Sequence, residues 1–156
     1  MYPNDYRYRI AENEKSKIME GAHRPGHFDG VLTVVMKLLN LVNPTRIYFG
    51  EKDYQQLMLI RDMVSSFFLD VKIVGCPTIR ENDGLALSSR NSLLTMGERA
   101  KAPVFSKALH SRKSAGNIKL ELTDSGFDVD YIDDHYGRRF GAIKLGNVRL
   151  IDNVKL

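Results

Sequence analysis

The chain has 156 residues, of which 43% are hydrophobic and 27% charged, and its formal net charge is +4. This length allows one domain, or one domain with a small appendage, and the composition is typical of a globular protein. No apolar run approaches the ~20 residues that cross a bilayer, and the polar start does not resemble a secretory signal, so we expect no membrane partner. The single cysteine, Cys76, cannot form an internal disulfide, and we interpret it as a buried packing thiol of a cytoplasmic protein.

Basic residues are not concentrated in any long segment. The densest clusters are the pairs Arg112-Lys113 and Arg138-Arg139. A nucleic-acid-binding surface requires a longer basic stripe with aromatic residues between the charges. We therefore expect these pairs to be solvated and expect no nucleic-acid partner, whereas the modest positive charge favours a small anionic substrate.

The chain begins with an irregular polar stretch and a predicted helix. Residues 14–20 are compatible with a short helix, and the glycines and proline of residues 20–28 indicate a loop. Residues 29–42 repeat apolar side chains at helical spacing, and Asn43-Pro44 ends that helix. The apolar face of the helix is formed by Leu32, Val35, Met36, Leu39 and Val42.

A strand–helix–strand unit follows. Residues 46–49 predict a strand that ends at Gly50, and residues 71–75 predict a second, buried strand. Asp53 is placed to cap the intervening helix, roughly 53–68. The inner face of that helix is predicted to carry Leu57, Ile60, Val64 and Phe67 or Phe68. Because parallel strands need crossover connections, this order predicts a parallel sheet that binds ligands at the carboxyl ends of its strands.

A smaller domain is predicted to begin near residue 93. Thr95 and Glu98 have the spacing of a capping box, which opens a helix that reaches about Ser111. Residues 114–117 are interpreted as a linker. The strict alternation of residues 118–122 favours a strand, and a short helix remains the alternative.

The chain ends with predicted strands. Residues 127–132 have the composition of a strand. Residues 140–145 and 148–151 are predicted to pair as a hairpin joined by Gly146-Asn147. We therefore expect an α+β arrangement in this part of the chain.

The run Gly50-Glu51-Lys52-Asp53 has the chemistry of a phosphate-binding turn. A glycine at a strand end allows a ligand to approach the backbone, and the following helix start offers N–H groups to an anion. Lys52 adds a point charge that suits phosphate, and Asp53 is placed to cap the helix or to bind a ribose hydroxyl. The alternative is an ordinary strand-to-helix turn with a surface lysine.

A second candidate lies in the loop from Asp83 to Asn91. Ser88, Ser89 and Arg90 can contact phosphate oxygens, and the guanidinium can neutralise charge that develops as pyrophosphate leaves. Gly84 allows the loop to flex and close. The alternative is a polar turn before a helix.

Further polar side chains offer substrate contacts. The amides of Gln55 and Gln56 can hold hydroxyls or a carboxylate, and Arg24 with His27 can contact an anion. The histidines do not have the spacing of metal ligands, so we predict no metal site within the chain. No arrangement typical of covalent catalysis is present.

Three runs, in this order, resemble the pantoate–β-alanine ligase family: Glu20-Gly-x-x-Arg-Pro-Gly-His-Phe-x-Gly30, Gly50-Glu-Lys-Asp-Tyr-Gln-Gln56 and Asp83-Gly-Leu-Ala-Leu-Ser-Ser-Arg-Asn91. The closing run Gly146-Asn-Val-Arg-Leu-Ile-Asp-Asn153 is similar to the family's C-terminal end. The resemblance covers residue 2 to the end. It implies an α/β fold: the C-terminal half of a Rossmann-like nucleotidyltransferase domain (residues 1–93), followed by a small α+β domain (residues 94–156).

The resemblance also implies a reaction. Members of the family use ATP and Mg²⁺ to activate pantoate as pantoyl adenylate, with release of pyrophosphate. The amine of β-alanine then displaces AMP and forms pantothenate. The complete enzyme is implied to be a cytoplasmic homodimer.

Carried over by motif, the implied ATP contacts are Gly50, Glu51, Lys52, Asp53, Ile79, Leu87, Ser88, Ser89 and Arg90. Ile79 would contact adenine through its backbone, and Lys52 and Arg90 would act as the catalytic phosphate cations. Gln56 corresponds to the family's pantoate-binding glutamine. Arg24 and His27 would lie near the substrate pocket.

The chain departs from the family pattern in several respects. The Met-Gly-x-Leu-His-x-Gly-His-type run of the family, a second substrate glutamine and the acidic Mg²⁺ ligands do not occur in it. We therefore interpret the chain as a C-terminal portion with half of an active site, and expect it to be inactive alone. The segment 114–135 is shorter than in the family. Two alternatives remain open: a non-catalytic nucleotide-binding or assembly module, and a different adenylate-forming member of the superfamily.

Overall fold

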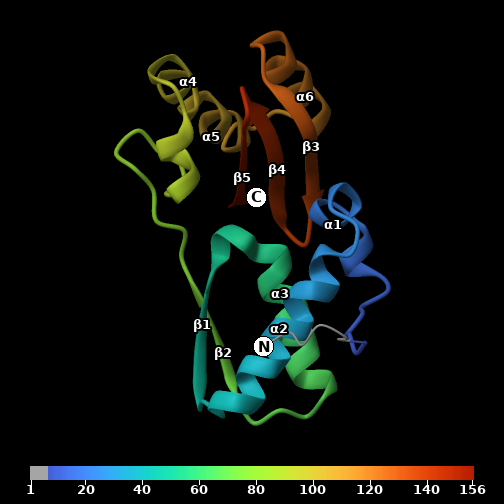
Figure 1. Ribbon diagram of the computed structural model, residues 1–156. Coiled ribbons are helices and arrows are strands. Elements are labelled where there is room, and N and C mark those ends of the chain that lie inside the picture. Colours follow the sequence, from blue (N-terminus) through green and yellow to red (C-terminus); the bar gives the residue numbers. More distant parts are fainter. Residues whose placement is uncertain (1–6) are drawn as a thin grey trace. The chain divides into compact units, whose positions relative to one another are not determined.

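The computed structural model describes residues 7–156, so the first six residues of the expected irregular start lie outside it. The chain divides into two compact units, one ending at Cys76 and the other beginning at Pro77 (Figure 1). Both helices and strands occur in each unit, which gives the mixed α/β fold that the sequence predicts. Within the described residues, no helix has the length and apolar character needed to span a membrane.

The first unit is built on a parallel strand pair. Its main elements are α2 (His27–Val42), β1 (Arg46–Gly50), α3 (Tyr54–Ser66) and β2 (Lys72–Cys76). The two strands pair in parallel, with Gly50 opposite Cys76, and α3 is the crossover between them (Figure 1). The predicted strand–helix–strand unit is confirmed, so Gly50 and Cys76 mark the carboxyl ends of their strands.

The core of the first unit lies between the helices and one face of the strands. Its buried members are Phe28, Leu32, Val35 and Leu39 of α2, and Leu59, Ile60, Met63 and Val64 of α3. The strand residues Ile47, Phe49 and Ile73 pack against this cluster. Helical spacing of apolar residues therefore predicts most of the buried face correctly.

Three expected core residues are exposed. Val42 lies in the last turn of α2, and its side chain faces solvent. Phe67 and Phe68 lie beyond α3, which ends at Ser66 rather than near residue 68, and Phe68 is 95% exposed. Phe68 adopts a positive φ of 53°, which ends the helix and turns the chain toward β2.

The segment before α2 is more regular than expected. The expected helix over residues 14–20 is reduced to a 3₁₀ turn, η1 (Lys15–Lys17). The expected loop is partly wrong, because α1 (Glu20–His23) is one helical turn and α2 already begins at His27. Gly21 permits this arrangement, since a Cβ at that position would overlap the backbone carbonyl of Ser16.

The second unit contains an antiparallel sheet in the order β3 (Asp128–His135), β4 (Arg138–Leu145) and β5 (Val148–Lys155). The predicted hairpin is confirmed: β4 and β5 pair across Gly146-Asn147, and Gly146 has a positive φ of 57°. Helices α5 (Pro103–Leu109) and α6 (Ala115–Asp124) supply the other side of the core. Its fully buried residues include Phe105, Leu109, Ile118, Leu122 and Ile143.

The helices of the second unit begin at identifiable caps. The Thr95–Glu98 capping box is confirmed at the start of α4 (Met96–Lys101). The expected continuous helix to Ser111 is wrong, because Pro103, which lacks an N–H group, opens the separate helix α5. Residues 118–122 are helical, and the expected linker contains the cap of α6, where Ser114 Oγ accepts a hydrogen bond from Asn117 N–H.

The Arg138-Arg139 pair is buried, so its interpretation as a solvated surface is wrong. Arg138 Nε donates to Asn153 Oδ1 at 2.7 Å. Arg139 forms an ion pair with Asp134 and donates to the carbonyl of Ser111 at 3.0 Å. Partners on neighbouring strands and loops therefore replace water around both guanidinium groups.

The boundary between the two compact units lies after Cys76, whereas the sequence led us to expect a domain boundary near residue 93. The division after Cys76 assigns residues 77–93 to the second unit. The reason is a set of side-chain bonds, among them those of Arg80 to Asp152 and of Glu81 to Arg99. The predicted candidate turns consequently belong to two units, Gly50–Asp53 to the first and Leu87–Arg90 to the second.

A matched pair of substitutions tests the helical conformation of α6. Leu122 is fully buried, whereas Leu120 on the same helix is 65% exposed. We expect Leu122→Ala to lower the free energy of unfolding by about 2–5 kcal/mol and Leu120→Ala by less than about 0.5 kcal/mol, as measured by urea denaturation. In a strand, both side chains would share one face, so equal losses would contradict the helix.

Candidate functional site

The first candidate turn follows β1 directly. Gly50 is the last residue of the strand, and Glu51–Asp53 forms a 3₁₀ turn, η2, that leads into α3. A Cβ built at Gly50 would meet no atom within 4 Å, so the backbone here is open to close approach. Asp53 occupies the expected N-cap position, but its side chain makes no capping hydrogen bond. The turn therefore combines an accessible backbone, the positive end of α3 and the Lys52 ammonium group.

The second candidate turn follows a small hairpin. Arg80 and Ala86 form an isolated antiparallel bridge, and Leu87 N–H donates to the carbonyl of Ile79 at 2.9 Å. Gly84, with a φ of +89°, lies in the hairpin's turn. The side chains of Ile79 and Leu87 are 67% and 56% exposed. The hairpin thus presents two apolar side chains next to the polar run that follows it.

Ser88, Ser89 and Arg90 form the turn itself. Ser88 Oγ accepts a hydrogen bond from Arg90 N–H at 3.2 Å and caps η3 (Ser89–Leu93). The Arg90 side chain is exposed and forms no ion pair with any residue from 7 to 156. The nearby arginines differ, because Arg80 pairs with Asp152 and Arg99 pairs with Glu81 and Asp83. Arg90 therefore has the charge and exposure to receive an external anion.

The hairpin is held by Arg99 of α4. Its guanidinium donates to Glu81 Oε2 at 2.6 Å and to Asp83 Oδ2 at 2.7 Å. Hydrogen bonds from Asn91 and Arg99 hold the pKa of Glu81 below its ordinary value, and Arg99 and the Leu85 N–H lower the pKa of Asp83. Both carboxylates are consequently ionised at neutral pH and compensate Arg99 rather than Arg90.

Asn91 closes the turn from its other end. Its buried side-chain amide donates to Glu81 Oε1 at 2.6 Å and to the carbonyl of Ala86 at 3.1 Å. Its backbone N–H donates to the carbonyl of Ser88 at 3.0 Å. The loop that was expected to flex at Gly84 is thus fixed at several points by buried or half-buried side chains.

The substrate candidates Arg24 and His27 are brought together in the first unit. Arg24 Nη1 lies 3.1 Å from His27 Nε2 and donates to Glu20 Oε1 at 3.1 Å. The Glu20 carboxylate is largely buried, whereas Arg24 is partly exposed. The motif therefore builds a small charged group in which Glu20 orients the guanidinium.

The two glutamines of α3 have different environments. Gln55 is buried, accepts from Glu20 N–H at 3.1 Å, and donates to the carbonyls of Lys15 and Ile18. These bonds attach the segment before α2 to the start of α3. Gln56 is half-buried and is the member of the pair that remains a candidate for substrate binding.

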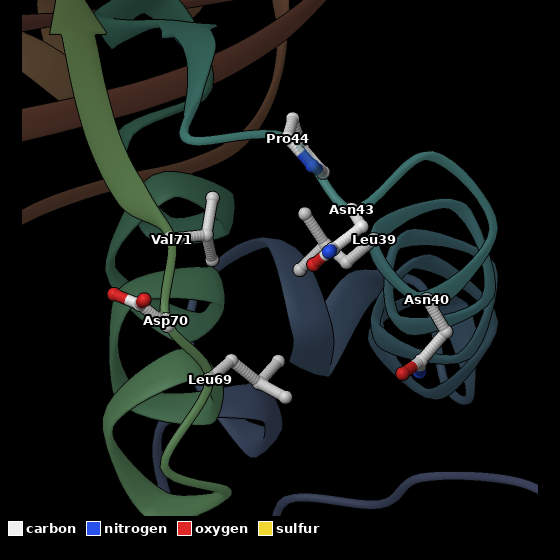
Figure 2. Close-up of a pocket in the computed structure, with 7 residues that line it drawn as sticks. All are labelled: Leu39, Asn40, Asn43, Pro44, Leu69, Asp70 and Val71. Atoms are coloured by element: carbon white, nitrogen blue, oxygen red, sulfur yellow. The ribbon is translucent and has the colours of Figure 1, made fainter.

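A small pocket in the first unit lies away from the candidate turn. It is lined by Leu39, Asn40, Asn43, Pro44, Leu69, Asp70 and Val71 (Figure 2). These residues precede β1 and β2, so the pocket is at the amino ends of the strands, opposite Gly50. Its volume of about 50 Å³ is far below the roughly 300–1,000 Å³ of typical ligand sites. We therefore do not assign a nucleotide to it.

Several residues of the site were not predicted from the sequence. They are Gln55 as a structural residue, Asn91, Arg80, Arg99 and Asp152. Asn91 and Asp152 do lie in two of the runs that resemble the ligase family, and this resemblance was the only sequence feature that pointed to them. Among the described residues, no three His, Cys, Asp or Glu side chains gather as metal ligands. Cys76 is half-buried rather than buried.

Comparison with known proteins identifies the family. The family model described as "Pantoate-beta-alanine ligase" matches residues 1–155. The chain belongs to this family. The expectation from the three sequence runs is therefore confirmed, and the alternative of a different adenylate-forming family is not supported.

Relatives of this ligase family are similar over the whole chain. The pantothenate synthetase of Bdellovibrio bacteriovorus is 60% identical over 156 residues, and that of Legionella pneumophila strain Corby is 55% identical. The chain spans 62% of the length of each of these relatives.

Solved structures of the family show the same fold. Pantothenate synthetase from Thermus thermophilus matches with a TM-score of 0.89 at 41% identity, over 99% of this chain and 66% of that one. The pantoate-β-alanine ligase of Francisella tularensis, complexed with "Beta-gamma ATP" and β-alanine, matches with a TM-score of 0.91 at 42% identity, over 99% of this chain and 60% of that one. The expected fold, a parallel sheet followed by a small α+β part, is confirmed.

Proposed function

We propose that the chain supplies two ATP-binding turns of a pantoate–β-alanine ligase, Gly50–Asp53 and Leu87–Arg90. The observation that carries the proposal is the exposed guanidinium of Arg90, which has no acidic partner among residues 7–156 although Arg80 and Arg99 are both paired. An exposed guanidinium beside two serine hydroxyls suits a polyphosphate. Membership of the ligase family supports ATP as that polyphosphate.

The proposed reaction condenses pantoate with β-alanine through pantoyl adenylate. A pantoate carboxylate oxygen attacks the α-phosphorus of ATP, and the bond to pyrophosphate breaks. Lys52 and Arg90 neutralise the charge that develops on the phosphates. The β-alanine amine then attacks the acyl carbon and AMP leaves. The ligands of the Francisella tularensis relative are consistent with this choice of substrates.

The remaining candidate residues receive positioning roles in this proposal. Ser88 and Ser89 are assigned to donate hydroxyl hydrogen bonds to phosphate oxygens, Asp53 to bind a ribose hydroxyl, and Glu51 to contact the nucleotide. Ile79 is assigned to adenine through its backbone, and the exposed side chain of Leu87 provides further apolar contact. On the first unit, Gln56, Arg24 and His27 are assigned to pantoate, with Glu20 holding Arg24 in place.

Magnesium is proposed to accompany ATP, but the chain's own residues do not fit a protein-held Mg²⁺ site. Such a site needs several carboxylate or carbonyl oxygens around one position. No cluster of three acidic, histidine or cysteine side chains exists within residues 7–156. We therefore assign no catalytic step to the metal.

A non-catalytic role is the second candidate function. It concerns these 156 residues alone, which contain no His-x-Gly-His run of the kind that the family resemblance implies for phosphate binding. In this case the chain would bind nucleotide or assist assembly without turnover.

For the complete ligase we also propose a homodimer in the cytoplasm, which sedimentation velocity and cell fractionation would test.

ATP titration of the chain tests the site assignment. We expect wild-type protein to bind ATP, and Lys52→Ala and Arg90→Ala each to weaken binding about 10- to 100-fold, since charge-assisted hydrogen bonds contribute roughly 1.5–3 kcal/mol. Isothermal titration calorimetry measures the dissociation constants. Lys72→Ala and Arg112→Ala are matched controls, because both residues are exposed cations outside the candidate turns. ATP binding that is insensitive to Lys52→Ala and Arg90→Ala would exclude this site.

Pyrophosphate exchange tests whether the chain is catalytically complete. We expect no exchange of labelled pyrophosphate into ATP above background in the presence of pantoate and Mg²⁺. By analogy with an oxyanion donor, each absent phosphate-binding histidine would reduce the rate by about 10²–10³. Exchange at a rate typical of enzymes, about 1–10³ s⁻¹, would show that the described half-site is sufficient.

A further inference from the structure

The hairpin that precedes the Ser88-Ser89-Arg90 turn is anchored by an ion pair to a buried carboxylate. Arg80 Nη1 lies 2.6 Å from Asp152 Oδ2, and Arg80 Nη2 lies 3.0 Å from Asp152 Oδ1. The pair is bidentate, and the Asp152 side chain is only 2% exposed. The two residues are 72 positions apart in the sequence, so this bond joins the hairpin to β5.

The same guanidinium also fixes the hairpin's turn. Arg80 Nη1 donates to the carbonyl of Gly84 at 3.0 Å and to Ser106 Oγ at 3.1 Å. Ser106, which is buried on α5, donates to the same Gly84 carbonyl at 2.8 Å. One side chain therefore connects three segments of the second unit: the hairpin, α5 and β5.

These bonds continue to the phosphate-binding candidates. Arg80 is bridged to Ala86 across the hairpin, and the Ala86 carbonyl accepts the side-chain amide of Asn91. Residues 88–90 lie between Ala86 and Asn91, so both ends of this turn are attached to the hairpin that Arg80 holds. Two contacts, the Arg80–Ala86 bridge and the hydrogen bond between Asn91 and Ala86, thus connect Arg80 to the turn.

We propose that Arg80 is a positioning residue for ATP binding: through Asp152 it holds the Ser88-Ser89-Arg90 turn in the conformation that accepts phosphate. This inference rests on the proposed function. Both Nη atoms of Arg80 are already bonded to protein oxygen atoms, so Arg80 acts through the turn rather than on the nucleotide. The inference also gives a role to Asp152 in the closing run, which the ATP site does not otherwise use.

Lysine is the informative replacement for Arg80. It retains the positive charge beside the buried Asp152 carboxylate, which avoids an uncompensated buried charge. Its single ammonium group cannot reproduce the planar fork that joins Asp152, Gly84 and Ser106. Arg80→Lys should therefore loosen the hairpin while the second unit remains folded.

Arg149 provides a matched control. Arg149 Nε forms a 2.6 Å ion pair with Asp130, and both side chains are largely buried. Because side chains alternate along a strand, Arg149 lies on the opposite face of β5 from Asp152. Arg149→Lys therefore removes a guanidinium–carboxylate ion pair of similar burial that has no connection to the hairpin.

The first measurement is amide hydrogen exchange without nucleotide. We expect Arg80→Lys to accelerate exchange at least about tenfold for the N–H groups of Leu87 and Asn91, relative to wild type. The N–H groups in the middle of α3 should be unchanged, and Arg149→Lys should leave Leu87 and Asn91 protected. Unchanged protection of Leu87 and Asn91 in Arg80→Lys would overturn the proposal.

The second measurement is ATP affinity in a double-mutant cycle. We expect Arg80→Lys to raise the dissociation constant for ATP about tenfold or more, and to have no further effect in the Arg90→Ala background. Arg149→Lys should bind ATP as wild type does. Wild-type affinity in Arg80→Lys, or additive effects of Arg80→Lys and Arg90→Ala, would overturn the positioning role alone. Failure of the wild-type chain to bind ATP would overturn the proposed function, and the positioning role with it, whatever the exchange data show.

Discussion

A carboxylate that is removed from water needs a cation beside it, and in the second unit the buried Asp152 carboxylate forms an ion pair with Arg80. This single requirement joins a strand near the end of the chain to a hairpin that begins at residue 79. Ser106 and Gly84 complete the hydrogen bonds of the pair, so the hairpin is fixed to regular structure rather than left as a free loop. The exposed run of Ser88, Ser89 and Arg90 is a direct continuation of that fixed element.

The first unit uses a neutral buried group in a comparable way. The Gln55 amide bonds to three backbone groups of the segment that precedes α2, and so holds this segment against α3. In both units, buried polar side chains secure the irregular segments, while the functional candidates Lys52, Gln56 and Arg90 lie at the turns and helix starts beside them. Such a division of roles is expected of a site whose side chains must keep a defined geometry before a ligand binds.

Local sequence patterns predicted the fold well where one face of a helix or strand packs against the hydrophobic core of its unit. The apolar periodicity of α2, the parallel strand pair and the Gly146-Asn147 hairpin were all recognisable. The sequence did not decide between strand and helix for residues 118–122, because Ile118, Leu120 and Leu122 alternate as in a strand. In the structure Ser114 caps a helix there, and of these three side chains only Ile118 and Leu122 are buried. The candidate turns were recognisable from their residue types. The Arg80–Asp152 pair was not, because no local pattern connects residues so distant in the sequence.

The central proposal is that two turns from different compact units, Gly50–Asp53 and Leu87–Arg90, each contact ATP. Titration of ATP into ¹⁵N-labelled chain, followed by amide chemical shifts, tests this claim most directly. The account predicts that the amide signals of Gly50, Lys52, Ser89 and Arg90 all shift as ATP saturates the chain. Shifts at only one of the two turns would contradict it.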